Sequence, residues 1–154
     1  MPGVEPPEPG REPGPSRARR RAREDALRTL YRWEVVGEDL GGLAAELERV
    51  STQPEAVTSY AVHLVSLVAT GREEIDGVLG EALARWDLSR LAVIDRSILR
   101  VGTAELIFSA DVPTPVILNE SIEIAKKYGS AQSGGFVNGV LDRVAKITRS
   151  EETR

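Results

Sequence analysis

The segment SRLAVIDRSILRVGTAELIFSADVPTP, residues 89–115, indicates most clearly which fold class this sequence encodes. Its apolar residues recur every three or four positions, as on one face of an α-helix: Leu91, Ile94, Ile98, Val101 and Leu106. A serine that can cap a helix stands at its start, and a stretch with two prolines follows residue 109. The segment therefore predicts an amphipathic helix from about Ser89 to Ser109.

The residues that follow continue the helical pattern. Pro115 can open a second helix that runs to Tyr128, and Gly129 suits the left-handed position after its last turn. A final helix begins between residues 133 and 136. The pair Asn138-Gly139 usually marks a turn but falls inside this last pattern, so either the helix starts later or the glycine lets another backbone approach.

Three more helices are predicted before the opening segment. The first covers about Arg19 to Val36, and the second covers residues 40–50 although two glycines weaken its first turn. The third starts after the capping stretch at residues 51–54 and runs to about Leu79, with Gly71 as a point where it bends or divides. No stretch alternates polar and apolar residues with period two, so the sequence predicts an all-α fold.

Length and composition place these helices in one domain. A chain of 154 residues is long enough to bury a core. Residues 2–16 contain six prolines and three glycines and offer nothing to bury. We therefore expect a disordered tail at residues 1–16, one helical domain at residues 17–149 and a disordered end at residues 150–154.

The composition also excludes several kinds of site. The chain has no cysteine and one histidine, which excludes disulfides, thiolate zinc sites and imidazole clusters. The many carboxylates accompany no visible nucleophile with a base, and His63 is expected to be structural. No stretch approaches the roughly 20 apolar residues of a membrane span, and no apolar run follows the N-terminal arginines. We expect a cytoplasmic protein without a metal, a cofactor or a catalytic site.

An arginine cluster, RARRRAR, begins at Arg17 in a chain whose net charge is -4. On a helix, Arg20 and Arg21 can pair with acidic residues four positions further on, which leaves Arg17, Arg19 and Arg23 least compensated. Guanidinium groups bind phosphates through two hydrogen bonds and stack on bases. Two interpretations stay open here: an RNA-binding helix end, or a solvated basic one.

Two aromatic residues lie off the apolar stripes, Tyr128 at a helix end and Phe136 in the polar stretch SAQSGGFVNG. Burial statistics favour rings that cover the edge of the core. Exposed rings next to the arginine cluster would instead stack on single-stranded bases, at about 1 to 3 kcal/mol per base.

Four segments together resemble the family of the transcription antitermination factor NusB. They are RRRARE with ALRTLYRWE (residues 19–34), IDRSILRVGTAEL (94–106), VPTPVILNESIEIAKKYG (112–129) and FVNGVLDRV (136–144). The resemblance covers about residues 19–147 and implies an all-α fold of two small helical bundles packed into one domain. It implies no catalytic activity. It implies binding to the single-stranded boxA element of nascent ribosomal RNA leader transcripts, together with the ribosomal small-subunit protein NusE, in an RNA polymerase complex with other Nus factors.

Matching positions imply roles for individual residues. The residues implied to contact RNA are Arg19, Arg20, Arg23, Tyr128 and Phe136. Gln132 stands where some relatives have an acidic residue that limits RNA affinity. Asp95 matches an acidic position on the side that faces NusE, although a solvated helix charge explains it equally well.

Two other interpretations compete with this one. A NusB-like domain also precedes the catalytic part of certain RNA cytosine methyltransferases, but this chain has neither room for the cofactor domain nor a cysteine nucleophile. A helical protein-protein interaction module, without sequence-specific RNA binding, remains the alternative. In that case the arginine cluster would meet an acidic protein partner.

Overall fold

The computed structural model describes residues 14–150. Within this range the backbone forms six α-helices and one short 3-10 turn, and no strand. They are α1 (Pro15–Val36), α2 (Leu40–Val50), α3 (Glu55–Leu83), η1 (Leu88–Arg90), α4 (Val93–Phe108), α5 (Thr114–Tyr128) and α6 (Ser133–Thr148). The all-α prediction is confirmed.

The two predicted disordered termini fall mostly outside the described residues. Residues 1–13 and 151–154 lie beyond the described range. Two residues assigned to the tail, Pro15 and Ser16, instead form the start of α1. A proline fits there because the first turn of a helix leaves its backbone N–H groups without helical partners.

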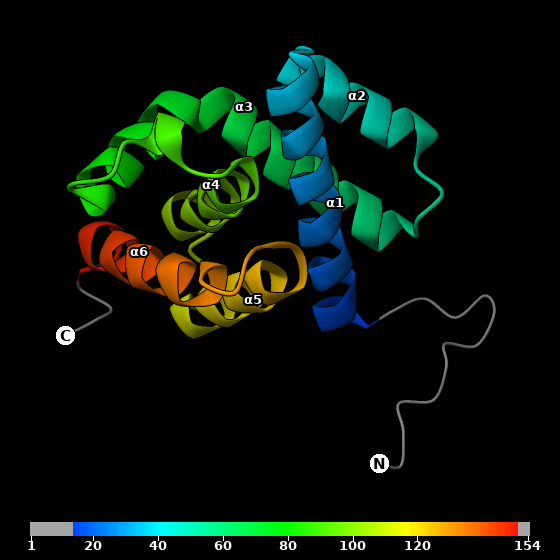
Figure 1. The fold of residues 1–154 in the computed structure, drawn as a ribbon. Helices are drawn as coiled ribbons and strands as arrows, with labels where there is room; N and C mark the ends of the chain where they lie inside the picture. The colour runs from blue at the N-terminus through cyan, green and yellow to red at the C-terminus, as the bar shows by residue number, and fades with distance from the viewer. Residues whose placement is uncertain (1–13, 151–154) are drawn as a thin grey trace.

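The helices form two groups of three, as Figure 1 shows. In the first group α1 and α2 pack on α3, and in the second α4, α5 and α6 pack on one another. α3 and α1 both contact α4, and α3 also contacts α6, so one core of buried aliphatic side chains runs through both groups. The expected pair of small bundles packed into one domain is therefore present.

Helix α4, encoded by the opening segment, packs both on the other helices of its own group and on α1 and α3 of the first group. Every residue from Ser97 to Leu106 is buried, so this stretch is enclosed all round rather than along one stripe. Gly102 lets α6 approach, since a Cβ atom there would lie 2.8 Å from Cδ1 of the buried Leu141. The small residue thus brings the last helix against the central one.

Two predicted helix boundaries are wrong. Ser89 does not cap α4 but lies in η1, where its N–H and hydroxyl both donate to Asp87 (3.0 and 2.8 Å). α3 continues through Gly71, and the ring of Phe108 occupies the space that a side chain there would take, 2.7 Å from an ideal Cβ. Gly71 therefore does not divide the helix, and it is a packing position for Phe108.

The glycines near helix ends also differ from one another. Gly37 ends α1 in the left-handed conformation, at φ 81°. Gly129 was predicted to do the same for α5 but has an extended backbone, at φ −95°. α6 starts at Ser133 and runs through Gly139, where the nearest atom to an ideal Cβ is Arg143 Nη1 at 3.9 Å, so neither explanation offered for Asn138-Gly139 applies.

Candidate nucleic-acid interface

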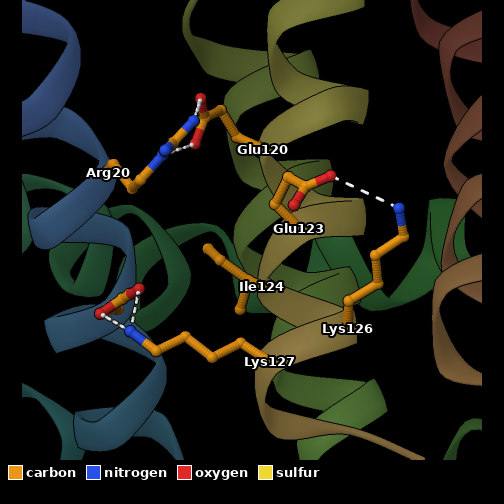
Figure 2. A pocket seen from close by; sticks show the side chains of 7 residues that line it. Arg20, Glu120, Glu123, Ile124, Lys126 and Lys127 are labelled. Atoms are coloured by element: carbon orange, nitrogen blue, oxygen red, sulfur yellow. Dashed lines mark hydrogen bonds and ion pairs between the residues drawn. The ribbon is translucent and has the colours of Figure 1, made fainter. Parts of the chain in front are cut away.

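The arginine-rich start of α1 lies beside α5, and ion pairs join the two helices (Figure 2). Arg20 donates two hydrogen bonds to Glu120, from Nε and Nη2, both 2.9 Å long. Lys127 donates to both carboxylate oxygens of Glu24, at 2.9 and 3.2 Å. Arg20 therefore pairs across helices, and not within α1 as its spacing from Glu24 predicted.

These residues line a shallow pocket of about 360 Å³. Three cationic side chains and three carboxylates surround it, with Ile124 on its floor: Arg20, Lys126, Lys127, Glu24, Glu120 and Glu123. Hydrogen bonds from Arg20 lower the pKa of Glu120. The pocket is thus electrically balanced even though it lies at the arginine cluster.

Arg23 has a different environment from the one its sequence position predicted. Its side chain is 3% exposed, and Nε and Nη2 donate to the two carboxylate oxygens of Glu105 at 2.7 and 2.8 Å. The hydroxyl of Tyr60 also donates to Glu105, at 2.6 Å, and burial together with that carboxylate raises the pKa of Tyr60. The prediction that Arg23 is poorly compensated is wrong, because α4 supplies a buried partner 82 positions away.

Arg19 remains accessible. Its guanidinium lies 4.7 Å from the centre of the Tyr60 ring and 3.8 Å from Asp111, and its side chain is 41% exposed. A cation over an aromatic face keeps most of its hydrogen-bond donors free for other groups. Arg19 thus lies at the surface beside α3 and the connection between α4 and α5, and Arg20 lies at the surface next to α5.

Tyr128 connects the end of α5 to α1. Arg28 donates to its hydroxyl at 2.8 Å, and that hydroxyl donates to Glu24 at 3.1 Å. Arg28 and Lys127 also lie 5.7 and 5.2 Å from the ring centre. The ring is half-buried, with cations around it, which suits stacking of a base beside phosphate-binding groups.

Phe136 and Gln132 lie at the start of α6. The Phe136 ring is half-buried and meets the ring of Trp86 edge-on, with centres 6.0 Å apart. Trp86 is 60% exposed, and the sequence analysis did not single it out. The feature of the sequence that could have revealed Trp86 is a large aromatic residue in a turn that follows a helix. Gln132 is exposed and precedes the first residue of α6.

Asp95 lies apart from these residues, in the first turn of α4. One of its carboxylate oxygens, Oδ1, is buried and has no hydrogen-bond partner among the described residues. Glu105, which holds Arg23, stands ten residues further along α4, roughly 15 Å at the rise of an α-helix. The structure thus places Asp95 and the arginine cluster toward opposite ends of one helix.

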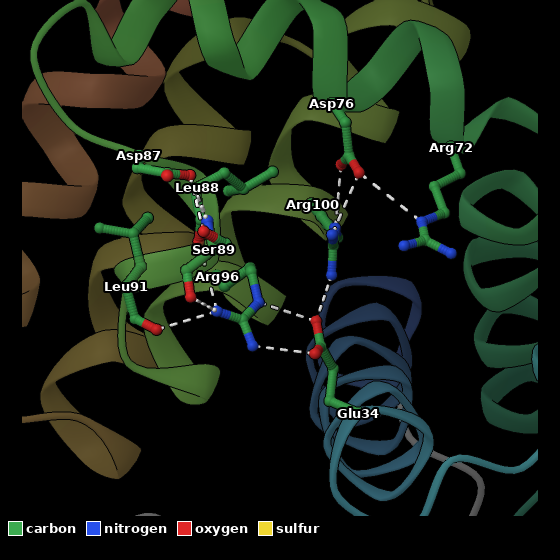
Figure 3. Close-up of polar contacts among 9 residues, drawn as sticks. All are labelled: Glu34, Arg72, Asp76, Asp87, Leu88, Ser89, Leu91, Arg96 and Arg100. Carbon is green, nitrogen blue, oxygen red and sulfur yellow. Dashed lines mark hydrogen bonds and ion pairs between the residues drawn. The ribbon is translucent and has the colours of Figure 1, made fainter.

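A second ion-pair network, which the sequence analysis missed, joins the other end of α1 to α4 (Figure 3). Arg96 donates to both oxygens of Glu34 at 2.8 Å, and Arg100 bridges Glu34 and Asp76 of α3. Hydrogen bonds from Arg96, opposed by some desolvation, lower the pKa of Glu34. α1 therefore runs antiparallel to α4 and is fixed to it near both of its ends.

Neither a metal site nor a membrane helix is found among residues 14–150. No three His, Asp or Glu side chains in this part of the chain gather as they would around a metal ion. None of its helices is both long and apolar enough to cross a bilayer.

Comparisons with known proteins agree with the fold. The model of the NusB family matches residues 20–146. The transcription antitermination protein NusB of Desulfitobacterium hafniense is 38% identical over 139 residues, which are 89% of this chain and 94% of that protein. The structure of T. maritima NusB superposes with a TM-score of 0.80 at 36% identity, over 92% of this chain and 97% of that one. A crystal structure of the antitermination factors NusB and NusE in complex with dsRNA gives a TM-score of 0.76 at 34% identity, over 85% and 98% of the two chains. This protein therefore belongs to the NusB family.

Proposed function

We propose that this protein is a transcription antitermination factor that binds the boxA element of nascent ribosomal RNA leader transcripts together with NusE. The main support for this proposal is family membership over residues 20–146, which is almost the whole helical domain. The structural match with a complex of NusB, NusE and dsRNA supports it further. The complex acts with RNA polymerase and other Nus factors. We also propose that the protein works in the cytoplasm and catalyses no reaction.

The RNA surface in this proposal follows the edge formed by α1, the end of α5 and the start of α6. Arg19 and Arg20 bind backbone phosphates, and the rings of Tyr128 and Phe136 stack on bases. Gln132 lies between the two rings in the chain and adds no negative charge that would repel RNA. All of these residues belong to the helical domain at residues 17–149, which we propose is the RNA-binding unit of the protein.

Arg23 has a supporting part in this proposal. The Arg23 guanidinium is buried against Glu105 of α4, so it does not reach a phosphate. The ion pair instead holds the first turns of α1 against α4. Its neighbours Arg19 and Arg20 are then presented from a fixed helix. A preorganised helix loses less conformational entropy on binding than a flexible arginine-rich arm.

The NusE side of the molecule is proposed to include Asp95. Its side chain is only partly buried, and a carboxylate at the surface can pair with a basic group of NusE. Asp95→Asn should therefore weaken NusE binding and leave binding of RNA alone unchanged. Isothermal titration with NusE and, separately, with boxA RNA distinguishes these two effects.

RNA binding tests the proposal directly. We expect wild type to prefer boxA RNA over a scrambled single strand at fixed salt, and NusE to strengthen that preference. An Arg19→Ala/Phe136→Ala variant should lose more than about tenfold in affinity, roughly 1.4 kcal/mol. Lys146→Ala serves as the control, since it also removes an exposed charge but lies in the last turn of α6.

Two results would contradict the proposed function, and a third would contradict the proposed RNA surface. Equal affinity for boxA and scrambled RNA in the presence of NusE would remove sequence recognition. No RNA binding with or without NusE would favour the alternative, a helical protein-protein interaction module. Unchanged binding by the double variant would move the RNA surface elsewhere on the molecule.

A further inference from the structure

Two cations already hold anions in the free protein: Arg20 of the proposed RNA surface, and Lys127, which lies beside the Tyr128 ring at the same pocket. Glu120 occupies the edge of the Arg20 guanidinium formed by Nε and Nη2, with two bonds of 2.9 Å. Both oxygens of Glu24 accept from Lys127. Figure 2 shows the two pairs on opposite sides of the same pocket. An RNA phosphate that reaches this surface meets cations that are already paired.

The geometry makes Glu120 a direct competitor for a phosphate. A carboxylate and a phosphate both bind a guanidinium edge through two parallel hydrogen bonds, so they occupy the same donors. The side chain of Glu120 is 16% exposed and that of Arg20 is 56% exposed. The carboxylate is therefore packed against the protein below the guanidinium, and it stays in place when Arg20 turns toward a phosphate.

The Lys127–Glu24 pair has the same arrangement. The lysine side chain is 59% exposed and the carboxylate is 16% exposed. Glu24 also accepts from the hydroxyl of Tyr128, which keeps the carboxylate in place when the lysine leaves. Arg23 and Glu105 differ, because both are buried and neither can turn outward. The exposed pairs can therefore open by side-chain rotation alone.

We infer that Glu120 and Glu24 compete with the RNA backbone for Arg20 and Lys127, and that they limit the affinity of this surface for any single strand without affecting base choice. The inference rests on the proposed RNA-binding function and concerns how the same site is regulated. Phosphate contacts set affinity and carry no sequence information. The two carboxylates thus lower affinity for boxA and for unrelated RNA by the same factor.

Salt dependence distinguishes this competition from a general effect of negative charge. When a free cation binds a phosphate, the RNA releases a condensed counterion, and each contact adds about −0.7 to the slope of log K against log salt for a single strand. When Arg20 exchanges Glu120 for a phosphate, the released carboxylate attracts cations from solution, which reduces the net number of ions released. The Arg20 contact therefore adds less than the full value of about 0.7 to the slope in wild type.

The test compares Glu120→Gln with Glu123→Gln. Both residues are on α5 at the same pocket, but Glu123 pairs with Lys126 at 3.5 Å and is 59% exposed. Affinities for boxA and scrambled RNA are measured at several salt concentrations by fluorescence anisotropy, after circular dichroism has shown that the variants are folded. An Arg20→Ala variant and the Arg20→Ala/Glu120→Gln double variant complete the set.

We expect Glu120→Gln to bind both RNAs about three- to tenfold more tightly, with an unchanged ratio between them. Its salt slope should be steeper than that of wild type, by up to about 0.7, the value for one full phosphate contact. Glu123→Gln should give a smaller gain and the wild-type slope. In the Arg20→Ala background, Glu120→Gln should give no more than the Glu123→Gln gain, because Glu120 acts through Arg20.

Failure of this inference is distinguishable from failure of the proposed function. If wild type prefers boxA but the Glu120 and Glu123 variants behave alike, the competition is absent and the function stands. A gain at Glu120 that persists without Arg20 also overturns the inference. If wild type shows no preference for boxA even with NusE, the proposed function fails and the inference fails with it.

Discussion

Arg23 shows how a single residue can look functional in the sequence and be structural in the fold. In RARRRAR its nearest acidic neighbour in the chain is Glu24, which a helix turns away from it. Its actual partner, Glu105, is supplied by α4 and is 1% exposed. No local spacing could reveal this pair, because it depends on how α1 packs against α4. Arg19 and Arg20, by contrast, are surface residues as the sequence predicted.

The buried pair gives a strong prediction for stability. Glu105→Gln keeps the size of the side chain but leaves the charge of Arg23 buried without a counter-ion, which typically costs about 3–5 kcal/mol. We expect a loss of this order in the unfolding free energy from urea denaturation followed by circular dichroism. Glu123→Gln, on the exposed face of α5, should change it by less than about 0.5 kcal/mol. Equal effects of the two substitutions would show that the Arg23–Glu105 pair is not closed in solution.

Glu34 gives a prediction for pH dependence. Its pKa is lowered in the folded protein, so it stabilises the fold above its unfolded pKa of about 4.3 and loses that contribution as pH falls through the folded value. The difference in unfolding free energy between wild type and Glu34→Gln should therefore be largest near neutral pH and shrink below about pH 4.3. Urea titrations from pH 7 to pH 3 measure it. A difference that grows toward low pH would contradict the assigned direction.

At the scale of the helices, periodicity predicted the number of helices and most of their buried faces. It failed where a neighbour decides the geometry. Gly71 was predicted to bend or divide the third helix, but α3 runs through it without a break, and the ring of Phe108 fills the space that a side chain there would take. Ser89 was predicted to cap the helix that became α4, but Asp87 instead caps the short turn η1, which contains Ser89 and precedes α4. These outcomes depend on residues distant in sequence or on competition between adjacent polar side chains.

The helix glycines give a prediction at this scale. At Gly102 an added methyl group would meet Leu141 at 2.8 Å in the core, and we expect Gly102→Ala to destabilise by about 1–3 kcal/mol. At Gly77 nothing lies within 4 Å of an ideal Cβ, so Gly77→Ala should stabilise by about 0.5–1 kcal/mol through helix propensity alone. Thermal unfolding of the two variants compares them, and the same sign for both would refute the packing argument.

At the scale of the whole molecule, the continuous core and the two ion-pair networks make the helix groups mutually dependent. We expect them to unfold together. The two tryptophans report on different parts, because Trp33 lies on α1 and Trp86 contacts Phe136 of α6. The variants Trp33→Phe and Trp86→Phe each keep one tryptophan. In each variant, the unfolding midpoint measured by tryptophan fluorescence should equal the midpoint measured by circular dichroism.

A core substitution extends this prediction. Leu99→Ala, in the buried centre of α4, should lower the stability reported by either tryptophan by the same amount, about 2–5 kcal/mol. Separate midpoints for the two probes would mean that the groups fold as independent units. Their shared core and the contacts of α4 with both groups argue for one transition.

The balanced pocket between α1 and α5 also has a consequence for kinetics. Long-range attraction accelerates association when a surface presents a net field, and here each inner carboxylate offsets the cation above it. An RNA strand would then arrive at the rate of ordinary diffusion and exchange partners only after contact. Residence time, rather than speed of arrival, would distinguish a transcript that carries the right bases from one that does not.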